Sequence, residues 1–206
     1  MTTRVKICGL TGSEAVKLAA DAGAHAVGFV HYPPSSRHLD FPAIEHLVRQ
    51  TPPFLQTVGL LVNPDAAIIQ KLKATGVDLL QIHGQGADHC EALGYPYIQA
   101  IPVRTIEDVD HALERFPNAR ALLLDAFHAT GAGGTGLTFN WRLIPKKHAS
   151  RLIIAGGLTR DNVGSLIREY HPCAVDVSSG VESQPGVKSA DKIRTFMHAV
   201  ATAHAG

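Results

Sequence analysis

Arg151-Leu-Ile-Ile-Ala-Gly156-Gly157-Leu158 and Ala174-Val-Asp176-Val-Ser178-Ser179-Gly180-Val181-Glu182 are the two stretches that decide the fold. Each begins as a short, β-rich apolar run and ends abruptly in small residues. Apolar runs without alternation are typical of strands buried on both faces, as in a parallel sheet. Small residues at the strand ends let backbone N–H groups approach a ligand closely. We therefore expect a phosphate cradle made of Gly156, Gly157, Ser178, Ser179 and Gly180.

In eight-stranded α/β barrels, such a cradle follows strands seven and eight, so six earlier strand–helix units should precede it. The chain supplies them at a spacing of roughly 25 residues. Strands are expected at residues 5–9, 26–31, 57–62, 79–83, 97–102 and 121–125, within 151–158, and from 174 to 178. Helices are expected at residues 14–22, 42–50, 64–75, 89–93, 106–116 and 190–203. Two more are expected, one that begins at about residue 140 and one that follows Thr159 and ends at residue 170.

Several helix boundaries have recognisable end signals. Thr11-Gly-Ser-Glu14 resembles a capping box, and Gly23 is expected to end the first helix. Asn63 is expected to cap the third helix with Pro64 as its first residue, and Thr105 and Thr159 are expected to cap later ones. Eight strands with short connections and no linker between them predict a single (β/α)8 TIM-barrel domain over residues 1–206.

Composition excludes several partner classes. The net charge is +1 and the basic residues are scattered, which argues against nucleic acid or an anionic membrane as a partner. No apolar run approaches the roughly 18 residues that span a bilayer, and no signal peptide is recognisable at the N-terminus. The three cysteines form no regular pattern, which favours a reducing cytoplasm. The twelve histidines show no zinc-binding spacing, so we expect no metal.

Two residues at predicted strand ends carry the candidate chemistry. Cys8 ends the first strand, where a thiolate could serve as nucleophile or general base, although free cysteines are often simply buried. Asp125 follows three leucines, and a carboxylate at the end of a buried strand is costly unless it is paired or used. Cys90 and Cys173 do not lie at strand ends, and we expect them to be structural.

Three further side chains are candidates for binding a substrate. Arg37 lies in a proline-containing loop, and its guanidinium suits a planar carboxylate. Asp176 could hold loop backbone or bind a sugar hydroxyl. His83 could bind a ligand, carry a proton or pack as a polar residue, and the sequence does not rank these roles.

Residues 131–136 match the pattern G-x-G-x-x-G. The match does not open a helix directly, and no acidic strand end follows about 20 residues later, so it is a weak indication of a dinucleotide site. We interpret the glycine-rich residues 126–139 as a lid over the barrel mouth.

Taken together, these motifs resemble the phosphoribosylanthranilate isomerase family over essentially the full chain. The matching segments are Lys6-Ile-Cys-Gly9, Ser35-Ser-Arg37, Gln81-Ile-His-Gly84, Leu124-Asp125, Gly133-Gly-Thr-Gly136, Ala155-Gly-Gly-Leu158 and Asp176-Val-Ser-Ser-Gly-Val-Glu182. The first and last of these are quite specific in combination. The chain departs from the family pattern at Ser36 and Arg160, where the family often has proline.

The resemblance implies an Amadori rearrangement of a phosphorylated small molecule in tryptophan biosynthesis, without a cofactor. It implies that Asp125 is the general acid that opens the furanose ring and that Cys8 is the base that removes the C2 proton. Arg37 would hold the anthranilate carboxylate, and the cradle would hold the phosphate. The active species would be a monomer or a homodimer.

Three alternatives stay open from the sequence. The isomerase of the histidine pathway resembles this barrel but has acidic residues where Cys8 and Asp125 stand. A metal-dependent pentose-phosphate epimerase would need His and Asp ligands at several strand ends, and this pattern is incomplete. A non-catalytic barrel that binds a phosphorylated ligand would not need both Cys8 and Asp125.

Overall fold

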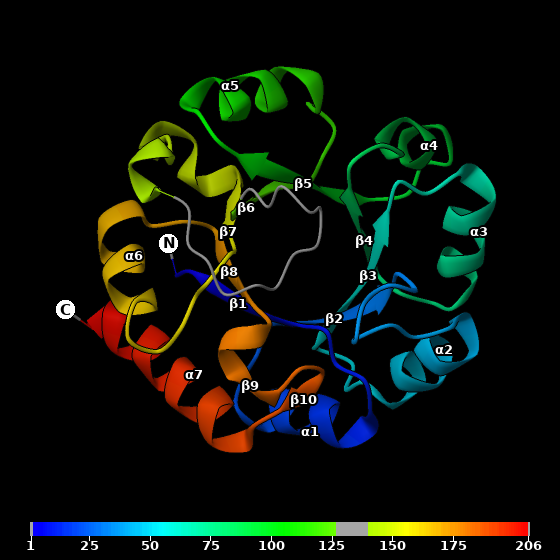
Figure 1. Ribbon diagram of the computed structural model, residues 1–206, viewed down its shortest axis with the longest axis horizontal. Helices are drawn as coiled ribbons and strands as arrows, with labels where there is room; N and C mark the ends of the chain where they lie inside the picture. The colour runs from blue at the N-terminus through cyan, green and yellow to red at the C-terminus, as the bar shows by residue number, and fades with distance from the viewer. Residues whose placement is uncertain (1, 127–139, 206) are drawn as a thin grey trace.

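Eight parallel strands close into a barrel in the computed structural model, which describes residues 2–126 and 140–205 (Figure 1). Each strand pairs with its neighbours in sequence order, and β1 pairs with both β2 and β8. The predicted barrel is therefore confirmed. The strands are β1 Arg4–Cys8, β2 Ala26–His31, β3 Gln56–Val62, β4 Leu79–His83, β5 Tyr97–Val103, β6 Ala121–Ala126, β7 Leu152–Ile154 and β8 Ala174–Val177.

Helices surround the barrel as an outer layer (Figure 1). They are α1 Ser13–Asp21, α2 Phe41–Gln50, α3 Ala66–Ala74, α4 Ala87–Ala92, α5 Ile106–Arg115, α6 Val163–Tyr170 and α7 Ala190–Ala205. After β8, the 3₁₀ turn η3 Ser179–Val181 leads into a small antiparallel hairpin of β9 Glu182–Gln184 and β10 Val187–Lys188. This hairpin places Glu182 and Lys188 beside the end of β8, before α7 begins.

The helix predicted from residue 140 is wrong for the described residues. They form two 3₁₀ turns, η1 Trp141–Leu143 and η2 Lys146–Arg151, between β6 and β7. Pro145 separates the turns, and a residue before proline is disfavoured in the α conformation. Ile144 accordingly has ψ 114°, which is extended. The predicted lid and the G-x-G-x-x-G match at residues 131–136 lie outside the described residues.

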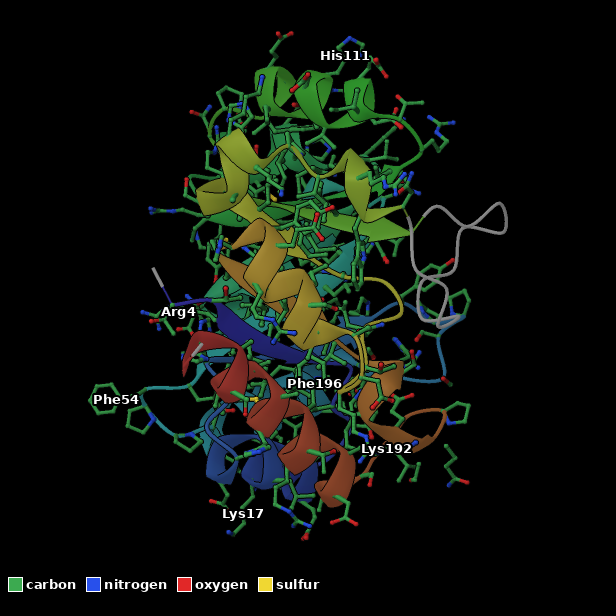
Figure 2. The ribbon with its side chains drawn as sticks, turned by 90° about the vertical axis from the view of Figure 1, so that its left-hand side faces the viewer. Arg4, Lys17, Phe54, His111, Lys192 and Phe196 are labelled. Carbon is green, nitrogen blue, oxygen red and sulfur yellow. The ribbon has the colours of Figure 1, made fainter. Side chains whose placement is uncertain are left out.

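The apolar core has two layers. One layer fills the inside of the barrel with residues such as Val58, Leu79, Ile98 and Leu123. The larger layer lies between the strands and the helices, where Phe196 of α7 packs at 1% exposure (Figure 2). Alternation along each strand separates the layers, so residues two apart face the same side.

One predicted cap belongs to another residue. Asn63 does not cap α3, because the helix begins after Asp65, whose carboxylate accepts a hydrogen bond from Ile68 N at 2.8 Å. Asn63 has a left-handed backbone with φ 46°, and its Oδ1 accepts from Gln85 N at 2.9 Å. It therefore ties the end of β3 to the loop after β4, and Pro64 precedes the helix instead of starting it.

Two other predicted caps are also absent. The Thr11 hydroxyl donates to the carbonyl of Gly186 at 3.1 Å, so it is bound to the β9–β10 turn instead of capping α1. Thr159 precedes α6 by a full turn, and its N–H donates to Asn162 Oδ1 at 2.8 Å. The predictions for Gly23 and Thr105 are confirmed, since Gly23 follows α1 with φ 83° and Thr105 precedes α5 in a capping box with Asp108.

Candidate active site

Cys8 lies at the C-terminal end of β1 and is 6% exposed. It pairs in register with Gly28 of β2, and an added Cβ at position 28 would lie 2.7 Å from Cys8 Sγ. Gly28 therefore provides the space that the sulfur occupies. Burial raises the pKa of the Cys8 thiol, and the neighbouring Lys6 ammonium opposes this only in part. The prediction that Cys8 sits at the barrel mouth agrees with this placement.

Lys6 and Asp176 form a buried ion pair beside Cys8. Lys6 Nζ donates to both carboxylate oxygens of Asp176 at 3.0 Å, and the side chains are 4% and 8% exposed. Burial acts to lower the pKa of Lys6, but Asp176 and Cys8 outweigh it, so the pKa lies above the ordinary value. The sequence singled out Asp176 as a substrate contact; its observed partner is Lys6, which the sequence did not single out.

Arg37 lies against Glu182 of β9. Arg37 Nε and Nη2 donate to the two carboxylate oxygens of Glu182 at 2.8 Å and 2.7 Å, in the bidentate geometry that favours arginine. Lys188 Nζ also donates to Glu182 at 2.7 Å and reaches the carbonyl of Ser178 at 3.1 Å. Burial acts to raise the pKa of Glu182, but the hydrogen bonds from Arg37 and Lys188 outweigh it and hold the pKa below its usual value.

His83 ends β4 and lies beside Gln81, which faces the same side of the strand. Burial, aided by the Lys6 charge, lowers the pKa of His83 to about 4, so the imidazole is neutral near pH 7. Gln81 Nε2 lies 2.8 Å from His83 Nε2, so the two side chains are within hydrogen-bonding distance.

Asp125 lies near the end of β6, paired in register with Pro102 of β5, and its side chain is half-buried. It is two residues from Leu123, which belongs to the core inside the barrel, so Asp125 faces the same interior. Cys8 and Asp125 thus face the same interior from β1 and β6, at the ends where barrel enzymes bind their substrates.

The predicted phosphate cradle has the backbone that such a site needs. Gly156 and Gly157 adopt φ 79° and 61°, which favour glycine, and Asn162 Nδ2 donates to the carbonyl of Gly157 at 2.9 Å. An added Cβ at Gly180 would lie 1.9 Å from the carbonyl oxygen of Leu158, so this loop tolerates no side chain there. The two loops therefore pack directly against each other beyond β7 and β8.

Four polar residues of this mouth were not singled out by the sequence: Lys6, Gln81, Glu182 and Lys188. Three of them stand inside motifs that carried the family resemblance, and Lys6 shows a detectable signal as a charge two residues before Cys8 in a buried strand. Among residues 2–126 and 140–205, no group of three or more His, Cys, Asp or Glu side chains could hold a metal ion. No helix in the same ranges is long and apolar enough to cross a membrane.

Comparisons with known proteins identify the family. The family described as "N-(5'phosphoribosyl)anthranilate (PRA) isomerase" matches residues 5–199. The chain is 48% identical over 200 residues to N-(5'-phosphoribosyl)anthranilate isomerase of Thiobacillus denitrificans, covering 96% of this chain and 97% of the relative. It is 46% identical over 202 residues to the Dechloromonas aromatica protein of the same name, covering 97% of each.

Solved structures agree with this assignment. The phosphoribosyl anthranilate isomerase of Thermotoga maritima has a TM-score of 0.86 at 34% identity, covering 98% of this chain and 100% of that one. A complex of the same kind of isomerase with reduced 1-(o-carboxyphenylamino)-1-deoxyribulose 5-phosphate has a TM-score of 0.85 at 33% identity, with the same coverage. The chain belongs to the N-(5'-phosphoribosyl)anthranilate isomerase family and is an isomerase of tryptophan biosynthesis.

Proposed function

We propose that this isomerase carries out its Amadori rearrangement with Asp125 as general acid and Cys8 as general base. Protonated Asp125 gives its proton to the furanose ring oxygen of N-(5'-phosphoribosyl)anthranilate, and the C1–O bond breaks to leave an iminium ion. The Cys8 thiolate then removes the C2 proton, and the enolamine formed tautomerises to the aminoketose. The observation that carries the proposal is the placement of both groups at the C-terminal ends of strands that face one interior. The steps require no cofactor.

Binding at both ends of the substrate would position the reacting carbons between these two groups. The phosphate would lie against the backbone of Gly156, Gly157 and Gly180, with Ser178 and Ser179 beside it. This placement is supported by the left-handed backbone at the first two glycines and the close packing at the third. Lys188, which bonds Ser178, adds a positive charge behind the loop.

Arg37 would hold the anthranilate carboxylate, using the edge of the guanidinium that Glu182 leaves open. Nε and one N–H of Nη2 are engaged, and three of the five N–H donors remain. Glu182 fixes the plane of the guanidinium, so the open edge of Nη1 and Nη2 has one orientation. The contact with Glu182 also restricts the loop of Arg37, which lacks the proline that the family usually has at position 36.

His83 and Asp176 would contact the ribose portion. The His83 imidazole is neutral near pH 7 and can offer a ring nitrogen to a ribose hydroxyl. Each Asp176 oxygen already accepts a bond from Lys6 and keeps a second lone pair for a sugar hydroxyl. Asp176 would therefore bind a sugar hydroxyl in addition to its contact with Lys6.

Substrate selectivity tests this proposal against the histidine-pathway alternative. The disappearance of phosphoribosylanthranilate fluorescence would be followed with wild type and Arg37→Ala, and compared with an analogue that lacks the ortho carboxylate. Loss of the Arg37 guanidinium should reduce kcat/KM for the natural substrate by roughly ten- to a hundred-and-fifty-fold, because a charged hydrogen-bonding partner contributes about 1.5–3 kcal/mol. Equal losses on the analogue would show that Arg37 holds the loop and not the carboxylate.

The assembly and location of the enzyme are further proposals. A solved relative is named as a mutually generated monomer of dimeric phosphoribosylanthranilate isomerase from Thermotoga maritima. This chain could act as a monomer or as a homodimer, and light scattering after size exclusion distinguishes the two. The single domain over residues 1–206 and the cytoplasmic location also stay predictions.

A further inference from the structure

Lys6 and Cys8 both belong to β1, and both are buried, at 3% and 6% exposure. The two residues are two apart on one strand and therefore share a face. An added Cβ at Gly28 would lie 2.7 Å from Cys8 Sγ and 3.1 Å from Lys6 Cε, so both side chains flank one point over β2. The Lys6 ammonium acts on the Cys8 thiol and favours its ionised form, which opposes the effect of burial on the thiol pKa.

Asp176 fixes the ammonium in this position. The register of the closed barrel places Lys6 opposite Asp176 on β8, and both carboxylate oxygens accept from Nζ at 3.0 Å. An ammonium has three donors. Two are directed at Asp176, and the third is available for the sulfur of Cys8.

Charged groups of other elements also act on Cys8. Lys188 of β10 and Arg37 of the loop after β2 both act on Cys8, and both are paired with the single carboxylate of Glu182. His83 of β4 is neutral near pH 7 because its pKa is about 4. These groups comprise three cations and two carboxylates, so a thiolate at Cys8 would make the cluster neutral.

We propose that Lys6, held by Asp176, is a positioning residue that stabilises the thiolate of Cys8 and directs it toward the C2 proton. The inference deepens the proposed function and rests on Cys8 as the base. When the thiolate takes the C2 proton, it becomes a neutral thiol, and Lys6 keeps its own proton throughout. Lys6 therefore acts on the basicity and placement of the sulfur and exchanges nothing with the substrate.

Two single variants should move the titration of Cys8 in opposite directions. Lys6→Met removes the cation and leaves the Asp176 carboxylate beside the sulfur, so the thiol pKa should rise by about one to two units. Asp176→Asn removes the repelling carboxylate, so the thiol pKa should fall. The double variant Lys6→Met/Asp176→Asn leaves no unpaired buried charge, and its Cys8 should still titrate above wild type. This double variant keeps the test valid if Lys6→Met does not fold.

The measurement is the ultraviolet absorbance of the thiolate against pH, taken as the difference between each protein and the same protein with Cys8→Ser. Subtraction removes the tyrosines, Cys90 and Cys173. The pH profile of kcat/KM for phosphoribosylanthranilate is recorded alongside, and kcat/KM of Lys6→Met near pH 7 should fall roughly ten- to a hundredfold. Lys17→Met is the matched control, because Lys17 is 72% exposed and pairs only with Asp21 in the described structure.

Opposite shifts of the titration, matched by shifts of the activity profile, support the inference. Unchanged titration in both the single and the double Lys6 variants overturns it, whatever their activity. Shifted titration with an unshifted activity profile would overturn the assignment of Cys8 as the base, and the positioning role with it. A purely structural role of Lys6 would lower stability without moving the titration.

Discussion

Gly28 leaves the space that is occupied by the sulfur of Cys8, the proposed base. An alanine Cβ there would lie 2.7 Å from Cys8 Sγ and 3.1 Å from the Cys8 Cα, distances at which the sulfur and strand must shift. We expect Gly28→Ala to lower kcat because the sulfur is displaced from Lys6, and to lower the free energy of unfolding by about 1–3 kcal/mol. Steady-state kinetics and urea denaturation measure both effects.

Gly12→Ala is the control for this change. Nothing lies within 4 Å of an added Cβ at Gly12, whose φ of −164° any residue adopts. It should leave kcat unchanged. A wild-type kcat in Gly28→Ala would mean that the sulfur position does not limit the reaction.

The residues of the candidate site differ in how well their positions and contacts could be predicted from the sequence. The positions of Cys8 and Asp125 at strand ends were predictable, because a reactive side chain at the end of an apolar strand is unusual in itself. Lys6 and Glu182 acquire their roles from partners 170 and 145 residues away, Asp176 and Arg37. Such a pairing depends on barrel register and on the β9–β10 hairpin, which no local pattern expresses.

At the scale of the element, strands were predicted more accurately than helix ends. An apolar run fixes a buried strand to within a residue or two, whereas several polar residues compete to cap each helix. At α3 the competitors were Asn63 and Asp65, and Asn63 is engaged by the backbone of the loop after β4. In the segment from residue 140, Pro145 interrupts the helix, and its effect outweighed the strand–helix alternation.

The cap of α3 provides a direct stability prediction. Asp65→Ala removes the acceptor for Ile68 N, so the free energy of unfolding should fall by about 0.5–2 kcal/mol while kcat stays close to wild type. Chemical denaturation measures the change. Asp161→Ala is the matched control: Asp161 is exposed and pairs with its neighbour Arg160, so it should cost much less. Equal losses in the two variants would contradict the assignment of Asp65 as the cap.

At the scale of the whole molecule, closure of the barrel places His83 in surroundings that lower its pKa. His83 has a folded-state pKa of about 4, below its ordinary 6.5, so the unfolded chain takes up this proton first as the pH falls. His83 therefore costs no stability above about pH 6.5, and the native state loses up to about 3 kcal/mol as the pH falls toward 4.

Urea denaturation of wild type and His83→Gln across this pH window tests the prediction. Glutamine stays neutral, so the free energy of unfolding should fall less in the variant as the pH falls toward 4. The carboxylates titrate in both proteins, so their contribution cancels in the comparison. Parallel pH dependence in the two proteins would show that His83 is not the buried neutral group described above.

The fold was predictable at this scale because eight buried runs at regular spacing allow few arrangements, and closure follows from the short connections. Because all eight strands end at the same side of the barrel, the side chains at these ends could be expected to lie near one another. The charge pairs across the mouth were not predictable, because several lysines and carboxylates could have paired in many ways before the register was known.

The turnover of Cys8→Ala and Asp125→Asn tests the central claim most directly. Both proteins should fold as wild type, and the fluorescence of phosphoribosylanthranilate should report a kcat reduced by roughly 10²–10⁴-fold in each, since each variant lacks one proton-transfer group. Circular dichroism and urea denaturation confirm that folding is retained. A near-wild-type kcat in either folded variant would contradict the assignment of that residue as the base or the acid.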